Sequence, residues 1–378
     1  MAEGAEKPRN LEEYENLARK RTAQTYFQYY NYPGTAGQTS TDSIAAFKRY
    51  RFRPQLMNDV STRKLSTTLL GKPVSLPIGV APTAFHRWVD TNGEISTAIG
   101  ASAVGSAMIQ SSFSAKHVRD VRAAVPHGVL WKNIHIWKDR RITKALIKAA
   151  EEAGYDALVI TVDSPMTAVD TDEFRRNYML YNHRDMRYPL MDLGLEEQEE
   201  AKRQGDENMI LYFASQYDAS VTWKDIQWLK TLTSLPIVCK GILTGRAARQ
   251  AVEAGANGII VSAHGGRQLD GVPASIDALA EVVEAVRGRN VEVYMDGGIR
   301  NGTDVLKALA RGAKAVFVGR PILWGLACGG AAGVEHVLTI LRTELDFAMA
   351  LCGCSDVNAI PSDVVVHESF YNISKSKL

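Results

Sequence analysis

The chain has 378 residues, and its 44 Lys and Arg against 42 Asp and Glu give a formal net charge of +2. This balance lacks the strong positive field of nucleic-acid or anionic-membrane binders, so we expect no nucleic-acid and no membrane partner. A hydrophobic fraction of 46% indicates a globular protein with a large core. Four cysteines in so long a chain predict no disulfide scaffold, and no His, Cys, Asp or Glu spacing predicts a metal.

The first 75 residues carry no strand pattern that belongs to the main domain. The opening MAEGAEKPRN has no apolar core, so we expect neither a signal peptide nor a membrane anchor there. No run approaches the roughly 18 apolar residues that a spanning helix needs. Residues 1–75 predict a helical segment that packs on the next domain, with an irregular Gly-, Pro-, Thr- and Ser-rich stretch from Tyr32 to Asp42.

From residue 76 to about residue 360, apolar runs of strand length alternate with amphipathic helical patterns such as Lys138–Glu152 and Gly302–Ala310. Near-continuous apolar runs are typical of parallel strands that are buried on both faces. Eight strand-helix units predict an α/β fold that closes into a (β/α)8 TIM barrel. The expected strands are Leu76–Val80, Ala107–Gln110, Val129–Ile134, Ala157–Val162, Pro236–Lys240, Gly258–Ser262, Val291–Met295 and Ala315–Gly319.

Two further segments stand apart from this alternation. Residues 165–220, after the fourth strand, form the longest gap between strands, and we expect a lid over the barrel mouth. Residues 361–378 are expected to be a C-terminal tail. They finish with Ser376-Lys377-Leu378, which predicts a peroxisomal address and its import receptor as a partner, although a Lys-rich tail can carry this tripeptide by chance.

Polar residues gather at the carboxyl ends of the predicted strands, where the active site of this fold forms. Their density is hard to explain by packing, although each one alone can be a loop residue with a satisfied hydrogen bond. They are Pro82 to Ala84, Ser111 and Ser112, Asn133 and His135, Thr161 and Asp163, Lys240, Ser262 and His264, Asp296 to Gly302, and Gly319 and Arg320.

Glycine-rich turns follow the seventh and eighth strands at Asp296 to Gly302 and at Gly319 to Pro321. Loops at these places usually hold a phosphate, because glycine lets backbone N–H groups approach an anion. Arg300 and Arg320 can add bidentate contacts. The other interpretation is a pair of tight left-handed turns. Neither turn matches a P-loop or dinucleotide fingerprint, so the sequence favours one phosphate.

Lys240 and His264 are the candidates for chemistry. A lysine at a strand end that points into the barrel mouth is either a Schiff-base nucleophile or a cation beside an electron-rich cofactor. His264 precedes two glycines and lies three residues before Arg267, which suits a general base beside an anion clamp. A lone histidine is often structural. Asp163 can orient the imidazole and stabilise its charge.

Together these residues resemble a known set. The chain resembles the FMN-dependent 2-hydroxy acid oxidases, the family of glycolate oxidase and the peroxisomal long-chain hydroxy acid oxidases. The resemblance runs from Tyr29 to about Cys354, and its strongest motifs are Ala81-Pro82-Thr83-Ala84, Ser262 to Asp270, Asp296-Gly297-Gly298 and Gly319-Arg320-Pro321. It implies FMN as cofactor, a small-molecule substrate, O2 as electron acceptor, a 2-oxo acid and hydrogen peroxide as products, and a homotetramer.

The resemblance also implies residue roles. His264 is the catalytic base with Asp163 behind it, and Lys240 stabilises reduced flavin. Arg267 grips the substrate carboxylate and Tyr29 adds a hydrogen bond, in a substrate set that includes Phe113, His135 and Asp170. The cofactor set comprises Pro82, Thr83, Ala84, Ser111, Asn133, Thr161, Lys240, Ser262, Asp296, Gly298, Arg300, Gly319 and Arg320.

The chain departs from the family in its substrate set. A second carboxylate-binding arginine, five residues beyond Pro165, is replaced by Asp170. The usual Gln and Tyr after the third strand are Asn133 and His135, and an Asn before the catalytic histidine is Ala263. A small anionic hydroxy acid should bind worse unless His135 is protonated or Arg175 or Arg176 moves in. The hypothesis is a substrate other than glycolate or lactate, with a positive group such as an amine; the alternative is a local realignment of the lid.

The function that follows is an FMN-dependent oxidase of a 2-hydroxy acid or an altered substrate, in the peroxisome. One alternative is a flavin-binding homologue that has lost catalysis and acts as a binding module. Another keeps the enzyme but replaces oxygen by a different acceptor. The charged character of residues 181–220, where membrane-associated dehydrogenase relatives carry an apolar insertion, favours oxygen.

Overall fold

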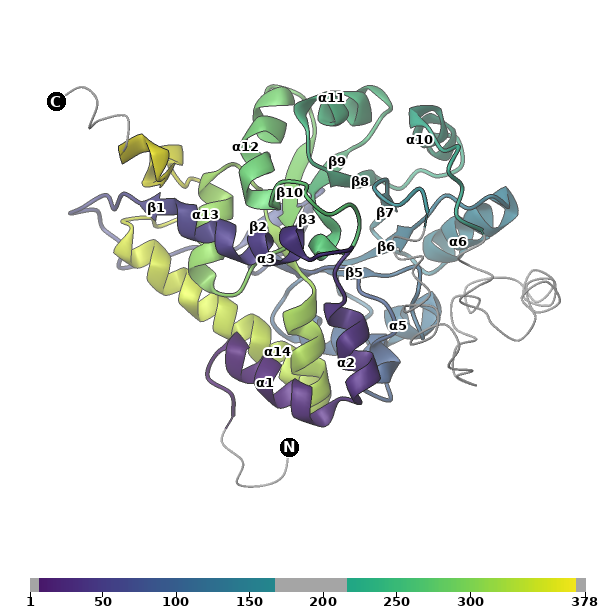
Figure 1. Cartoon of the computed structure of the whole chain (residues 1–378), viewed down its shortest axis with the longest axis horizontal. Coiled ribbons are helices and arrows are strands. Elements are labelled where there is room, and N and C mark those ends of the chain that lie inside the picture. Colours follow the sequence, from purple (N-terminus) through teal and green to yellow (C-terminus); the bar gives the residue numbers. More distant parts are fainter. Residues whose placement is uncertain (1–6, 167–215, 372–378) are drawn as a thin grey trace.

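A computed structural model describes residues 7–166 and 216–371 of the chain. Its centre is a closed barrel of eight parallel strands in the order β10-β11-β4-β5-β6-β7-β8-β9 (Figure 1). This confirms the predicted (β/α)8 fold. The strands are β4 (Ile78–Val80), β5 (Met108–Gln110), β6 (Leu130–Ile134), β7 (Ala157–Thr161), β8 (Ile237–Ile242), β9 (Gly258–Val261), β10 (Glu292–Asp296) and β11 (Val316–Val318).

Each strand overlaps one of the predicted runs, but β8 is longer than expected. It continues past Lys240 to Ile242, and its register with β9 shifts between these two residues, which marks a β-bulge. The residue between them is Gly241, with a φ of +111°. Bulges next to active sites re-aim side chains, and this one lies beside Lys240.

Helices cover the outside of the barrel. Each buries one face against the strands; in α6, Ile142, Leu146 and Ile147 are buried while the charged positions are not, and the Asp139 side chain caps the helix by accepting from the Arg141 N–H. The helices are α4 (Glu94–Ala103), α5 (Val118–Ala124), α6 (Arg140–Glu152), α10 (Trp223–Lys230), α11 (Gly245–Glu253), α12 (Ser275–Ala285), α13 (Gly302–Ala310) and α14 (Arg320–Leu351).

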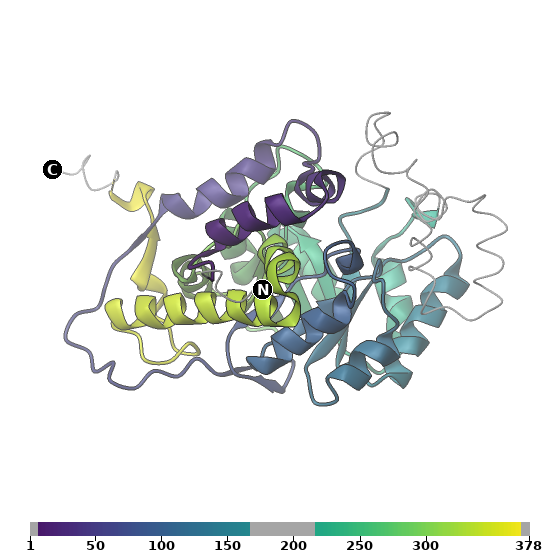
Figure 2. The same ribbon diagram turned by 90° about the horizontal axis from the view of Figure 1, so that it is seen from below.

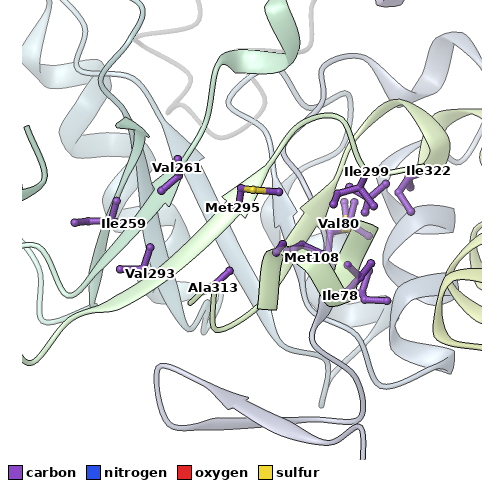
Figure 3. Packing of buried hydrophobic residues seen from close by; sticks show 14 of the residues in the cluster. Ile78, Val80, Met108, Ile259, Val261, Val293, Met295, Ile299, Ala313 and Ile322 are labelled. Atoms are coloured by element: carbon purple, nitrogen blue, oxygen red, sulfur yellow. The ribbon is translucent and has the colours of Figure 1, made fainter. Parts of the chain in front are cut away.

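Alternate residues of the strands divide the core into two layers. In β11, Val316 and Val318 belong to the outer layer between strands and helices, whereas Phe317 belongs to the layer inside the barrel. Figure 3 shows part of the outer layer, including Met108 and Met295. A Cβ atom at Gly79 would lie 2.6 Å from the Phe317 ring, so this small residue makes room for a large one inside the barrel.

A hairpin closes the amino-terminal end of the barrel. Its strands are β2 (Thr67–Leu69) and β3 (Lys72–Val74), and Leu69 and Val74 join the inner core layer. The turn uses Leu70 and Gly71, both with positive φ, as a two-residue hairpin turn requires. Because this end is sealed, the other end of the barrel holds the site.

The N-terminal segment consists of α1 (Leu11–Arg21), α2 (Gln24–Asn31), α3 (Gln38–Ala45), the 3-10 turn η1 (Ala46–Arg49) and β1 (Tyr50–Phe52). The irregular stretch predicted from Tyr32 to Asp42 was therefore wrong in its second half, where α3 begins. The reason is a distant cap: the Asp270 carboxylate accepts from the N–H groups of Gly37, Gln38 and Thr39 at 2.7 to 3.2 Å.

The C-terminal part of the described chain returns to the N-terminal segment. Strand β12 (Val365–His367) pairs antiparallel with β1 (Figure 2), after the 3-10 turn η6 (Ser362–Val364). The residues from 361 onward therefore contribute a strand before the part of the tail that lies outside the described residues. Ser376 to Leu378 fall in that outer part.

Helix α14 bends at Gly329 and Gly330, whose backbone angles are not helical. It is the single helix of the described ranges that is long and apolar enough to cross a membrane by length and composition. In its apolar window 56% of the residues are buried in the structure, and the helix packs against α1, α4 and α13, as a core helix does.

Candidate active site

A cavity of about 270 Å³ opens at the carboxyl ends of the strands. Most residues predicted from the sequence line it, although they come from all eight barrel strands, the loops after them and α2. The lining includes Tyr29, Pro82, Thr83, Ala84, Ser111, Phe113, Asn133, His135, Thr161, Lys240, His264, Arg267, Asp296, Gly298, Arg300, Gly319 and Arg320.

Two of the predicted residues that the structure describes do not line this cavity. Asp163 lies behind His264, and Ser262 is fully buried beneath Lys240. Asp170 lies outside the described residues, as do Arg175, Arg176 and nearly all of the predicted lid.

His264 and Asp163 form a hydrogen-bonded pair, with 2.9 Å between His264 Nδ1 and an Asp163 carboxylate oxygen. Burial raises the pKa of Asp163, but the neighbouring His264 and Lys240 outweigh burial and hold this pKa below its usual value. The carboxylate is therefore ionised and fixes the Nδ1 proton, so the other ring nitrogen of His264 is left as an acceptor. This is the arrangement of a general base with an orienting carboxylate.

The backbone at His264 is strained. His264 has a φ of +54° and is followed by Gly265 and Gly266, both also with positive φ, in the 3-10 turn η5 (His264–Gly266). A non-glycine residue in this region costs about 1 kcal/mol or more, and such strain concentrates at functional sites. The His264 N–H is held by the Ser262 hydroxyl at 3.0 Å, which helps to keep the turn in place.

Lys240 is a buried cation with two polar partners. Its ammonium donates to the Ser262 hydroxyl at 3.0 Å and lies 3.3 Å from an Asp296 carboxylate oxygen. These partners offset the desolvation of the charge, since an unpaired buried ammonium is strongly destabilising. The other Asp296 oxygen, Oδ1, is sealed from solvent and accepts no hydrogen bond from the described residues.

Two arginines gather at the end of the cavity formed by β10, β11 and their loops. Arg300 and Arg320 donate to backbone carbonyls, those of Ile299 for Arg300 and of Tyr30 and Gly265 for Arg320. In the described ranges neither has an ion-pair partner within 4 Å. Burial, followed by the charges of Arg267 and Arg300, lowers the pKa of Arg320 to about 9. Cations in this state are stabilised by an incoming anion.

These residues fit an FMN molecule. The N-terminus of α14 follows Gly319 and adds helix N–H groups to the two arginines at the predicted phosphate end. The unpartnered Oδ1 of Asp296 is an acceptor for a hydroxyl of a sugar chain. At the ring end, Asn133 donates to Thr161 Oγ1 at 2.9 Å, and Ser111 and Thr161 both face the cavity.

Arg267 connects the site to the N-terminal segment. One of its terminal nitrogens donates to the carbonyls of Tyr29, Tyr30 and Tyr32, and its guanidinium lies 4.9 Å from the Tyr29 ring centre. If Arg267 binds a substrate carboxylate as predicted, it must use the guanidinium nitrogens that do not donate to these carbonyls.

His135 does not supply the positive charge that the sequence left open. Burial, with a further contribution from His264, lowers its pKa to about 3, so it is neutral in the working pH range. This lowered pKa argues against a protonated His135 as the replacement for the missing arginine. Its Nδ1 lies 3.1 Å from the Ser112 hydroxyl.

The sequence reasoning missed several cavity residues: Tyr30, Ser40, Ser43, Ile44, Phe85, Tyr217 and Gln268. Those from α2 and α3 were hidden because no local pattern says that the N-terminal segment folds over the barrel mouth. Tyr217 lies near the end of the predicted lid and forms an isolated bridge with Trp137. Its Gln-Tyr-Asp setting carries no signal of a site. No group of three or more potential metal ligands occurs in the part of the chain that the structure describes.

Comparison with known proteins accounts for this arrangement. The model of the family described as FMN-dependent dehydrogenase matches residues 18–367. The chain belongs to the FMN-dependent dehydrogenase family. This assigns FMN as the cofactor of a hydroxy-acid oxidoreductase and agrees with the resemblance drawn from the motifs.

Several members of the family align with almost the whole chain. 2-Hydroxyacid oxidase 1 of Homo sapiens is 45% identical over 94% of this chain and 95% of its own length. L-lactate oxidase of Nostoc sp. is 44% identical over 93% of this chain and 96% of its own length. Among solved structures of this fold, a mandelate oxidase superposes with a TM-score of 0.84, at 32% identity, over 95% of this chain and 98% of that one.

Proposed function

We propose that this protein oxidises a 2-hydroxy acid to the 2-oxo acid and passes the electrons to O2, releasing hydrogen peroxide. The observation that carries the proposal is the His264–Asp163 pair at one cavity that also contains buried Lys240 and the arginines Arg300 and Arg320. The cavity thus contains a general base, His264, and Arg267 as a partner for the substrate carboxylate. It also contains a phosphate-binding end.

Each residue has a definite task in this proposal. The free ring nitrogen of His264 accepts the proton of the substrate hydroxyl, and ionised Asp163 stabilises the imidazolium that forms. Arg267 and Tyr29 orient the substrate carboxylate at the N-terminal side of the cavity. FMN, when bound, supplies the acceptor for two electrons. Lys240 holds a positive charge at the cavity floor, where negative charge increases during the reaction.

Anaerobic titration tests this function. The purified protein should be yellow, and a panel of (S)-2-hydroxy acids should bleach its flavin absorption; admission of air should restore the colour and generate peroxide. A colourless protein that does not take up FMN, or a yellow protein that no 2-hydroxy acid bleaches, would contradict the proposal. The second result would favour the binding-module alternative.

The proposal extends to where the protein works and how it assembles. The Ser376-Lys377-Leu378 tripeptide supports a peroxisomal location and recognition by the import receptor. The homotetramer and the preference for oxygen rest on the resemblance to the oxidases. The altered substrate charge inferred from Asp170 rests on the sequence alone. Imaging of a fluorescent fusion, with and without the last three residues, tests the location.

A further inference from the structure

One wall of the cavity carries polar atoms that the proposed mechanism does not use. His135 lies between the rings of Phe113 and Tyr217, with ring centres 5.6 and 5.3 Å away. All three side chains line the cavity. Trp137, behind them, contacts both His135 and Tyr217, so this wall is built from packed aromatic rings.

The hydrogen bonds determine which nitrogen of His135 carries the proton. Ser112 has a single hydroxyl hydrogen, and it donates this hydrogen to the Asn133 carbonyl at 3.0 Å. The Ser112 oxygen must therefore accept from His135 Nδ1, 3.1 Å away. Since the ring is neutral, its Nε2 is an unprotonated acceptor.

The acceptor on His135 is open to the cavity. Across the described residues Nε2 has no hydrogen-bond partner, and it is not among the sealed, unpartnered atoms. The Tyr217 hydroxyl likewise has no hydrogen-bond partner among the described residues, and it is not one of the sealed, unpartnered atoms. Burial, then the nearby Tyr29 and Asp163, raises the pKa of Tyr217, so the phenol keeps its proton and can donate it.

Tyr217 is held in place although it belongs to the last residues of the predicted lid. It forms an antiparallel bridge with Trp137, and the Lys138 N–H donates to the Gln216 carbonyl at 2.9 Å. The phenol therefore has a backbone anchor next to β6, the strand that also carries His135 towards the cavity.

We propose that His135 and Tyr217 form a specificity site for a second hydroxyl group on the substrate, so that the preferred substrates are 2,3-dihydroxy acids. This inference rests on the proposed function. A hydroxyl at C3 donates to Nε2 of His135 and accepts from the phenol of Tyr217, which satisfies both open groups at once. An unsubstituted alkyl group would leave both groups desolvated and unpaired, which is costly.

Two other substituents fit this wall less well. A carboxylate would face the lone pair of His135 Nε2 and gain a contact only from Tyr217. An ammonium group would enter a region that already holds the buried charge of Lys240, whose repulsion reaches His135. A hydroxyl is neutral, and it can both donate to Nε2 of His135 and accept from the Tyr217 phenol.

Three substrates of one carbon skeleton test the inference: (S)-lactate, (S)-glycerate and (S)-isoserine carry a hydrogen, a hydroxyl and an ammonium at C3. We expect the FMN-loaded enzyme to show a kcat/KM for glycerate at least about tenfold above that for lactate and isoserine, because a site built for a hydroxyl rejects the analogue that lacks it. In His135→Phe the glycerate-to-lactate ratio should fall below about threefold.

Two further variants separate hydrogen bonding from shape. Ser112→Ala leaves the imidazole in place but removes the acceptor that fixes its tautomer, so the ratio should fall while the ring volume stays the same. His127→Phe makes the same exchange as His135→Phe at an exposed position before β6, and its ratio should equal that of the unchanged protein.

Binding without turnover gives an independent measurement. 3-Hydroxypropanoate and propanoate lack the 2-hydroxyl and cannot be oxidised at C2, and their dissociation constants can be read from the flavin absorption. The hydroxylated compound should bind at least about fivefold more tightly, and His135→Phe should remove this difference.

The outcomes distinguish failure of the specificity site from failure of the oxidase function. Lactate used as well as glycerate, or a ratio that His135→Phe leaves unchanged, would overturn the specificity site while the oxidase function stands. Preference for isoserine would replace the hydroxyl by an amine and refute the inference as stated. Failure of every 2-hydroxy acid to bleach the flavin would refute the proposed function and, with it, this inference.

Discussion

At His264 a strained backbone and a hydrogen bond together fix the direction of the side chain. Its positive φ turns the imidazole toward the cavity, and its hydrogen bond of 2.9 Å to Asp163 sets the direction of the ring. Strain of this kind persists only where the surroundings enforce it. Here Ser262 holds the N–H of His264, and Gly265 and Gly266 supply the left-handed conformations that follow.

Asp163→Asn tests the role of the carboxylate. An amide keeps the shape but lacks the charge, and it permits the wrong tautomer of His264, so we expect the rate of anaerobic flavin reduction to fall at least about a hundredfold. FMN content should not change, because Asp163 does not line the cavity. Asp120→Asn, at an exposed position of α5, is the control. A reduction within about threefold of the parent would remove Asp163 from the mechanism.

Gly241 couples the bulge of β8 to the catalytic pair. A Cβ atom there would lie 2.5 Å from the Asp163 carboxyl carbon, and the φ of +111° already disfavours any other residue. Gly288 also has a positive φ, +75°, but nothing lies within 4 Å of a Cβ at that place. The two glycines therefore differ in steric contact while sharing a left-handed backbone.

Gly241→Ala and Gly288→Ala should consequently differ. We expect Gly288→Ala to cost about 1 kcal/mol of unfolding free energy and to keep full activity. Gly241→Ala should cost about 1 to 3 kcal/mol more and slow flavin reduction at least about tenfold, because Asp163 must shift away from His264. Urea unfolding and stopped-flow reduction measure both effects. Equal losses in the two variants would show that the backbone conformation alone matters.

Among the elements, α13 has a capping box that contains a buried acid. Asp304 accepts from the N–H groups of Arg300 and Asn301 at 3.0 and 3.2 Å, and Asn301 caps the helix in return. Burial, the largest effect, raises the pKa of Asp304 to about 6 in spite of these hydrogen bonds. The capped end of α13 thus follows the same turn that carries Arg300 to the cavity.

Stability should depend on pH through this residue. The folded-state pKa of Asp304 lies above the value near 4 of an unfolded chain, so its stabilising contribution is present below about pH 4 and is lost as the pH rises toward 6. Asp304→Asn cannot ionise. Relative to the parent, its unfolding free energy should rise between pH 4 and pH 7, by up to about 3 kcal/mol for a shift of two pKa units. Parallel pH curves would contradict this; Asp363→Asn, exposed in η6, is the control.

The sequence predicted elements well where their signal is local. Buried parallel strands such as β6 and β10 are short apolar runs, and polar residues follow them directly, so both the barrel and the floor of the site could be read. Helix α3 could not be read, because its first N–H groups are capped by Asp270, more than 230 residues away. Tyr217 was missed for a similar reason: its place beside His135 depends on a long-range bridge to Trp137.

On the scale of the whole molecule, the site joins two parts of the chain that are distant in sequence. Arg320, at the start of α14, donates to Tyr30 in α2 and to Gly265 after β9, while Arg267 donates to three carbonyls at and after the end of α2. The Gly34 N–H also donates to the Gly266 carbonyl at 2.8 Å. The N-terminal segment is therefore fastened across the barrel mouth by the residues that surround the phosphate end of the cavity.

Cofactor loading should stabilise the whole molecule, and chiefly through the phosphate. At a hundredfold excess over its dissociation constant, FMN should add about 3 kcal/mol of stability, or about 5 °C in Tm, over the protein stripped of flavin. Riboflavin keeps the ring and the ribityl chain but lacks the anion that relieves the buried charges of Arg300 and Arg320, so it should recover less than about half of this shift at equal concentration. Arg320→Gln should bring the two ligands close together, whereas Arg289→Gln, at an exposed loop position, should leave their difference intact. Equal stabilisation by riboflavin and FMN would place the binding energy in the ring pocket and not at the arginines.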